Sequence, residues 1–121
     1  MKTNIQFITE STNLSKQIIH FVDILPKKRA SWVITDQLLR STMSIGANIT
    51  EAQNASSPKD FINFLNHALK SADETTYWLE LCKELLPKKT HKIEEFQAQS
   101  TSLAKRLSSS IIKLRRKATL K

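Results

Sequence analysis

Apolar residues recur every three or four positions in four separate stretches of the chain. An α-helix turns once in about 3.6 residues, so this spacing collects them on one side of a helix. No stretch shows the alternation of apolar and polar residues that a half-buried strand requires. The pattern predicts four amphipathic helices, at about 4–25, 31–53, 57–86 and 90–114.

Capping residues and prolines mark the boundaries of these helices. Ser31, Ser57 and Thr90 are predicted N-caps, because a side-chain oxygen there can accept an N–H of the first turn. The prediction is strongest at Ser57, which Pro58 follows at the first helical position, with Asp60 three residues on as in a capping box. Prolines followed by cations, which suit a helix C-terminus, end the preceding helices: Pro26-Lys27-Lys28-Arg29 and Pro87-Lys88-Lys89.

Short connections between long helices favour antiparallel neighbours. We therefore predict an all-α fold, an antiparallel up-down-up-down four-helix bundle, formed as a single domain over residues 1–121. One glycine and three prolines in 121 residues are too few for a protein of many turns. The predicted core is Ile18, Leu38, Ile45, Ile49, Phe61, Leu65, Ala72, Leu79, Phe96, Leu103 and Leu107.

The composition indicates a cytoplasmic protein. The first residues lack the apolar run of a secretory signal, and no later segment approaches the roughly 18 apolar residues of a membrane span. The single cysteine, Cys82, cannot form an internal disulfide. These features favour a reducing compartment and no membrane association.

Candidate catalytic groups are few and scattered. The three histidines, His20, His67 and His91, fall on separate helices and have no second ligand at metal-binding spacing. Cys82 lies on an apolar stripe, which predicts a buried and unreactive thiol. We therefore expect no enzymatic activity, no cofactor and no metal.

Positive charge is concentrated near the C-terminus. Residues 1–96 carry 12 basic and 11 acidic side chains, whereas residues 97–121 carry seven basic side chains and no acidic one. Arg106, Lys113 and Lys117 are predicted to form one exposed basic edge that attracts a phosphate backbone. The alternative is a merely solvated basic end. The candidate nucleic-acid-binding residues are Lys105, Arg106, Lys113, Arg115, Arg116 and Lys117, with Lys121 beyond them.

The third helix carries a second stripe away from its core side, and this stripe includes Trp78, Leu81 and Leu85. A large apolar patch seldom stays exposed on a soluble monomer, so we expect these residues to be buried between subunits of a homo-oligomer. The alternative is a monomer with Trp78 at the margin of its own core.

Polar residues follow one edge of the second helix, beside its apolar stripe. Arg40, Asn48 and Glu51 lie there, and we expect them to form hydrogen bonds with neighbouring helices, with Glu74 as a partner of structural importance. The alternative is that these side chains are fully solvated.

The central stretch resembles a known family. The segments that carry the resemblance are Gln37-Leu38-Leu39-Arg40-Ser41, Ser44-Ile45-Gly46-Ala47-Asn48-Ile49, Glu51-Ala52, Ser57, Asp60-Phe61, Ala68-Leu69-Lys70, Glu74-Thr75 and Tyr77-Trp78-Leu79. Together they resemble the bacterial four-helix bundle proteins, also called intervening-sequence proteins of large-subunit rRNA genes. The accessory variability determinant of diversity-generating retroelements is similar. Ser71 departs from the family, in which Glu is common at this position.

The resemblance implies a four-helix subunit in a homopentameric ring and no catalytic role. For the retroelement relative it implies a partner that binds nucleic acid and a reverse transcriptase. Joined to the basic C-terminal end, it favours a noncatalytic, oligomeric scaffold or chaperone that binds RNA or DNA through phosphate contacts. The alternative is a structural or protein-binding assembly without nucleic acid.

Overall fold

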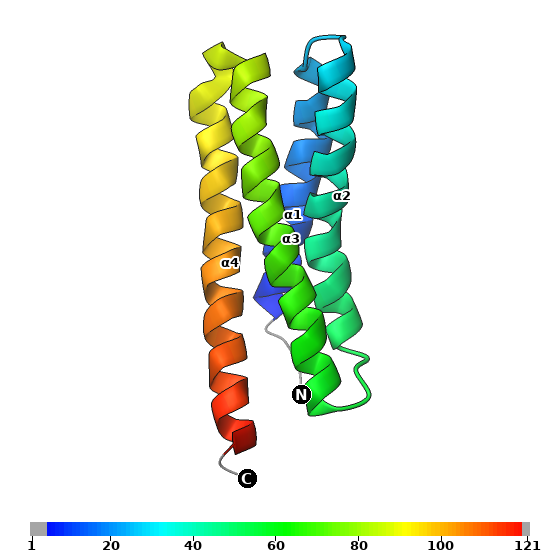
Figure 1. Cartoon of the computed structure of the whole chain (residues 1–121), viewed down its shortest axis with the longest axis vertical. Helices are drawn as coiled ribbons and strands as arrows, with labels where there is room; N and C mark the ends of the chain where they lie inside the picture. The colour runs from blue at the N-terminus through cyan, green and yellow to red at the C-terminus, as the bar shows by residue number, and fades with distance from the viewer. Residues whose placement is uncertain (1–4, 120–121) are drawn as a thin grey trace.

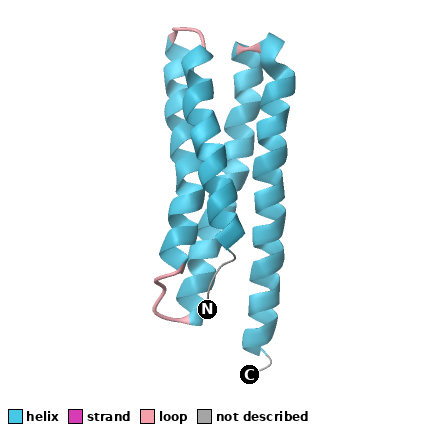
Figure 2. Ribbon diagram, turned by 180° about the vertical axis from the view of Figure 1, so that it is seen from behind, coloured by secondary structure: helices cyan, strands magenta, loops and turns pink. Residues whose placement is uncertain are grey.

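The computed structural model describes residues 5–119 and consists of four long helices. These run alternately up and down, and the loops that join them lie at the two ends of the bundle (Figures 1 and 2). Residues 5–119 contain no strand, so the predicted all-α fold is confirmed. The elements are α1 (Ile5–Phe21), η1 (Val22–Ile24), α2 (Arg29–Ala52), α3 (Pro58–Leu85), η2 (Pro87–Lys89) and α4 (Thr90–Thr119).

One continuous core fills the bundle, and every residue predicted to be in it is buried. Helix α3 packs against both α2 and α4 along much of its length, while α1 lies mainly against α2 and has a smaller contact with α4. Edge-to-face packing of Phe21 on Phe96, with ring centroids 5.2 Å apart, helps to join α1 to α4. Between Ile5 and Thr119 no helix combines the length and apolarity that a membrane span needs.

The predicted start of α3 is confirmed, with one difference in detail. The Asp60 backbone N–H donates to Ser57 Oγ over 3.1 Å, as an N-cap requires. The Asp60 carboxylate accepts from the backbone N–H and the hydroxyl of Ser56, one residue before the cap. The cap therefore fixes the turn between α2 and α3 as well as the first turn of α3.

The predicted N-cap at Ser31 is wrong. Helix α2 begins two residues earlier, at Arg29, and Lys28 is its N-cap. Ser31 is buried inside the first turn, where its hydroxyl has no hydrogen-bond partner among the described residues. Thr90 likewise begins α4 instead of capping it, and its hydroxyl donates to the carbonyl of Pro87.

Hydroxyl pairs join the helices where they approach most closely. Thr75 donates to Ser41 over 3.0 Å and Ser71 donates to Ser44 over 2.9 Å, both between α3 and α2. Thr76 and Ser100 form a similar bond of 2.6 Å between α3 and α4. Ser71, the departure from the family pattern, thus forms a hydrogen bond across the interface between α3 and α2.

Helix α1 approaches α2 at Gly46. A Cβ placed on Gly46 would lie 3.0 Å from Ser11 Oγ, which is tighter than ordinary van der Waals contact, and Ser11 is fully buried. The absence of a side chain on Gly46 is therefore what lets Ser11 occupy this contact.

We expect Gly46→Ala to be more favourable when Ser11 is also changed to Ala. Alanine is better than glycine in a helix interior by about 1 kcal/mol, but its methyl group would crowd the Ser11 hydroxyl. Urea unfolding of the two single variants and the double variant measures this coupling. An equal effect of Gly46→Ala in both backgrounds would show that the contact imposes no constraint.

Candidate nucleic-acid interface

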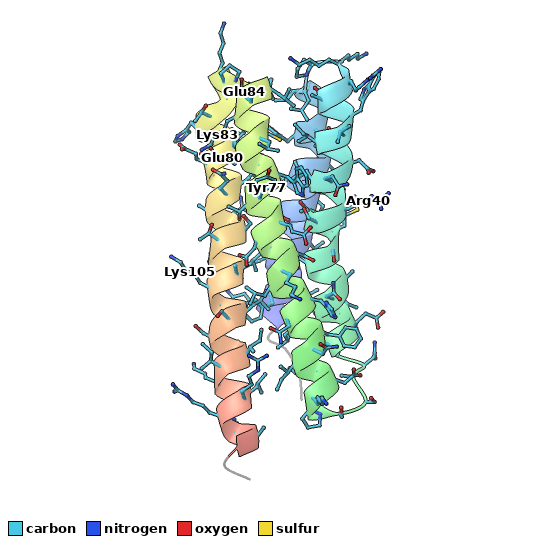
Figure 3. The ribbon with its side chains drawn as sticks, viewed as in Figure 1. Arg40, Tyr77, Glu80, Lys83, Glu84 and Lys105 are labelled. Carbon is cyan, nitrogen blue, oxygen red and sulfur yellow. The ribbon has the colours of Figure 1, made fainter. Side chains whose placement is uncertain are left out.

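The basic residues near the C-terminus surround the last turns of α4. Lys105, Lys113, Arg115, Arg116 and Lys117 are all exposed, and Lys105 projects from the outer side of α4 in Figure 3. At about 100° per residue, Lys113 and Lys117 share one side, whereas Arg115 faces α3 and Arg116 points outward. The cations form a basic end around the helix axis, not a single edge. Lys121 lies outside the described residues.

Arg106 does not belong to this exposed set, and its predicted place on the basic edge is wrong. Its guanidinium donates two hydrogen bonds to the Glu10 carboxylate, of 2.6 and 2.8 Å, and lies 5.3 Å from the centre of the Phe7 ring. The hydrogen bond from Arg106 lowers the pKa of Glu10, and Glu10 in turn raises the pKa of Arg106. This pair joins α1 to α4 and neutralises the charge that was assigned to a phosphate contact.

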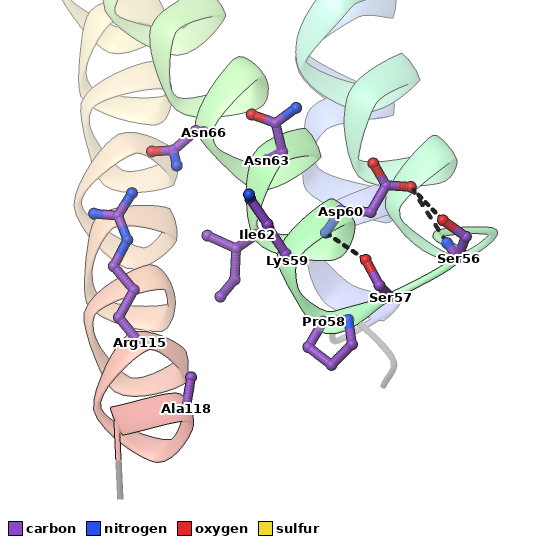
Figure 4. Close-up of a pocket in the computed structure, with 10 residues that line it drawn as sticks. All are labelled: Ser56, Ser57, Pro58, Lys59, Asp60, Ile62, Asn63, Asn66, Arg115 and Ala118. Atoms are coloured by element: carbon purple, nitrogen blue, oxygen red, sulfur yellow. Dashed lines mark hydrogen bonds between the residues drawn. The ribbon is translucent and has the colours of Figure 1, made fainter. Parts of the chain in front are cut away.

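The basic end borders a cleft between the first turns of α3 and the last turns of α4, with a volume of about 840 Å³ (Figure 4). Helix α1 starts partway along the bundle, so the last turns of α4 extend beyond it (Figure 1). Lys59 lines the cleft from α3 and Arg115 lines it from α4, so each wall supplies a cation. The sequence pattern did not single out Lys59, because it lies in the first turn of a helix far from the C-terminal charges.

At the other end of the bundle, ion pairs connect α3 with α4. Lys83 forms ion pairs with Glu80 at 3.0 Å and Glu94 at 3.3 Å, and Gln97 donates to Glu80 (Figure 3). The hydrogen bond from Gln97, together with that from Lys83, lowers the pKa of Glu80, while the bond to Glu80 raises the pKa of Lys83. This network joins α3 to α4.

The predicted oligomer residues are half-buried within the subunit. Trp78 and Leu85 pack partly against the core of their own chain, and Leu81 is also of intermediate exposure. The structure adds large apolar side chains that the pattern had not identified as surface residues. The exposed ones on α2 and α3 are Trp32 (67%), Val33 (57%), Met43 (46%) and Tyr77 (57%).

The expected hydrogen bonds from the polar edge of α2 to other helices are wrong for this subunit. Arg40 donates to Asp36 and Asn48 donates to Ser44, each four residues earlier in the same helix. Glu51 and Glu74 are exposed, and no described residue of another helix forms an ion pair or hydrogen bond with either. The hydroxyl pairs between α2 and α3 provide the specific polar contacts that were expected here.

The candidate catalytic groups stay apart. Burial raises the pKa of the Cys82 thiol to about 11, which keeps it protonated at neutral pH. The three histidines are exposed on different helices. Among residues 5–119 no group of three histidine, cysteine or acidic side chains is placed to hold a metal ion.

Comparison with known proteins shows similarity to a protein family and to a solved structure. Residues 3–109 match the family model described as 23S rRNA-intervening sequence protein. The fold is similar to that of a solved protein of unknown function from the S23 ribosomal protein family of Bacteroides thetaiotaomicron. That protein is 40% identical, and the match has a TM-score of 0.78 and covers 87% of this chain and 97% of that one. No curated protein matches the chain.

We expect Glu10→Gln to lower the free energy of unfolding by about 0.5–1 kcal/mol at pH 7. This is a modest loss, because both side chains are over one-third exposed and solvent screens the pair. Since Arg106 holds the pKa of Glu10 below 4.5, the stabilisation is complete above that pH and is lost as the pH falls through the lower folded-state value.

Denaturant unfolding between pH 7 and pH 3 measures this difference. Asp36→Asn is the matched control, because the Asp36–Arg40 pair is far more exposed and should contribute almost nothing. A Glu10→Gln variant as stable as the unmodified protein at pH 7 would contradict the structural role of the pair.

Proposed function

Because the chain belongs to the 23S rRNA-intervening sequence protein family, we propose that it is a noncatalytic, oligomeric protein that binds nucleic acid as a scaffold or chaperone. The observation that carries the proposal is the basic end of α4, where five exposed cations lie in a segment without an acidic residue. Such a surface attracts phosphates by charge, with little dependence on base sequence. RNA or DNA in the cytoplasm is the proposed ligand.

Assembly would make this weak site effective. A single basic end neutralises only a few phosphates, so one subunit binds weakly at physiological salt. If five subunits present their basic ends on one ring, effective concentration raises the affinity by about 10²–10⁴. A homopentamer is therefore part of the proposal, and a protein partner such as a reverse transcriptase is compatible with it.

A second function is a structural or protein-binding assembly without nucleic acid. Exposed Trp32, Val33 and Tyr77 favour it, because large apolar side chains at this exposure are typical of protein contacts. In this alternative the cations only keep the assembly soluble.

Charge reversal of Lys113, Arg116 and Lys117 to Glu should weaken binding to mixed-sequence RNA by more than about tenfold, with a shallower salt dependence. Arg106 is left unchanged because it holds α1 to α4. Filter binding across a salt series is the measurement, with sedimentation to verify that the oligomer persists.

The matched control reverses Lys27, Lys28 and Lys88, which are exposed near the loops at the opposite end of the bundle (Figure 1). This variant changes the net charge by the same amount but leaves the basic end of α4 intact. We therefore expect it to bind RNA more tightly than the α4 variant does. Equal losses in the two variants would indicate a nonspecific effect of total charge. No RNA or DNA binding by the unmodified protein would favour the second function.

We expect Leu81→Glu to disrupt the oligomer while the subunit stays folded. Leu81 is partly exposed and, unlike Trp78, is not packed on the core cluster. A charge at this position should therefore destabilise the association of subunits more than the folding of one subunit. Sedimentation at micromolar concentration measures assembly and circular dichroism measures helicity. Ile19→Glu on α1, at a more exposed apolar position, is the control and should assemble normally. A monomeric unmodified protein, or normal assembly of Leu81→Glu, would refute this interface.

A further inference from the structure

The cleft between α3 and α4 combines three kinds of chemistry that a nucleotide needs. Lys59 and Arg115 supply positive charge, Asn63 and Asn66 supply amide donors and acceptors, and Ile62 supplies an apolar surface. In Figure 4, Arg115 rises from α4 towards the level of Asn66, and Ile62 projects from α3 towards α4. The volume of about 840 Å³ lies within the range of small-molecule sites.

Asp60 is the one acidic residue among those lining the cleft, and its carboxylate points towards the loop before α3. Its carboxylate accepts hydrogen bonds from Ser56 on the loop side, of 3.2 and 3.3 Å (Figure 4). The lining therefore carries two cationic side chains, Lys59 and Arg115, and one carboxylate, which also helps to fix the turn before α3. This excess of positive side chains suits a phosphate group.

Asn63 and Asn66 give the cleft hydrogen-bonding groups that could contact a base, which the cations alone do not provide. Each amide offers a donor and an acceptor, the combination that pairs with the edge of a nucleobase. In an RNA duplex the Watson–Crick edges are paired and the major groove is too deep and narrow for side chains to read, whereas single strands expose both edges of a base. Lys113, Arg116 and Lys117, at the same end of α4, can hold the neighbouring phosphates.

We propose that this cleft binds one nucleotide of single-stranded nucleic acid, with its phosphate between Lys59 and Arg115 and its base edge at Asn63 and Asn66. The inference rests on the proposed function and adds a preference for single strands to it. It also assigns Lys59, Asn63 and Asn66, which lie far in sequence from the basic end of α4, to the same binding surface.

The test compares two probes, a mixed-sequence single-stranded RNA and its duplex, in filter binding across a salt series. We expect the Asn63→Ala/Asn66→Ala variant to lose about tenfold in affinity for the single strand. Its salt dependence should not change, because no charge is removed, and its affinity for the duplex should not change either. Asn13→Ala, an exposed amide on α1, is the matched control and should bind both probes normally.

Both substitutions place alanine at surface positions of a helix, so the variant should fold, and circular dichroism verifies this. A second measurement follows the side-chain amide signals of Asn63 and Asn66 by NMR during titration with adenosine monophosphate. Shifts in these signals that inorganic phosphate alone does not produce would support the base contact.

Three results would overturn the inference. They are unchanged single-strand affinity in the double variant, equal loss for single strand and duplex, or amide signals that adenosine monophosphate does not move. In each case salt-dependent binding that Lys113, Arg116 and Lys117 still control would leave the proposed function standing. If neither probe binds the unmodified protein, both the inference and the proposed function fail.

Discussion

Helix α2 can approach α1 and α3 closely only where the facing side chains are small, and the hydroxyl groups buried there must then find partners. Gly46 admits Ser11 of α1, and Ser41 and Ser44 meet Thr75 and Ser71 of α3. Ser11, Ser41 and Thr75 also donate to carbonyls of their own helices, so the bonds between helices are additional to those that satisfy each hydroxyl. These contacts between α2 and its two neighbours therefore favour one register, around which the apolar core can fill the remaining space.

The register of α1 has a direct consequence for the surface. With Ser11 fixed at Gly46, Glu10 lies where it can reach Arg106, and α1 begins well short of the end of α4. Within residues 5–119, the start of α3 lies beside the last turns of α4, and the two helices border the cleft. The same packing that satisfies the interior leaves a cationic helix end accessible.

Features that depend on neighbours in the sequence could be predicted, and features that depend on distant partners could not. The helical stripes and the cap at Ser57 follow from spacing and local hydrogen bonding, and the structure contains both. Arg106 looked like an exposed cation because its partner, Glu10, lies 96 residues away. The cleft could not be predicted from the sequence either, because Lys59 and Arg115 line the same cleft only when α3 and α4 pack together. Trp32 was overlooked because it lies on the side of α2 opposite the apolar stripe.

The apolar side chains proposed for assembly and the basic end of α4 proposed for nucleic-acid binding lie at opposite ends of the bundle, so use of one does not block the other. Trp32 and Val33 begin α2, and Leu81 and Leu85 end α3, so both pairs lie at the end of the bundle away from the α4 C-terminus (Figure 1). Subunits that meet through apolar side chains at this end would keep their basic ends uncovered. An assembly built this way gains binding strength by repeating a weak site, and each subunit gives up no part of that site to the interface. This separation is a reason to consider assembly and nucleic-acid binding as parts of one function.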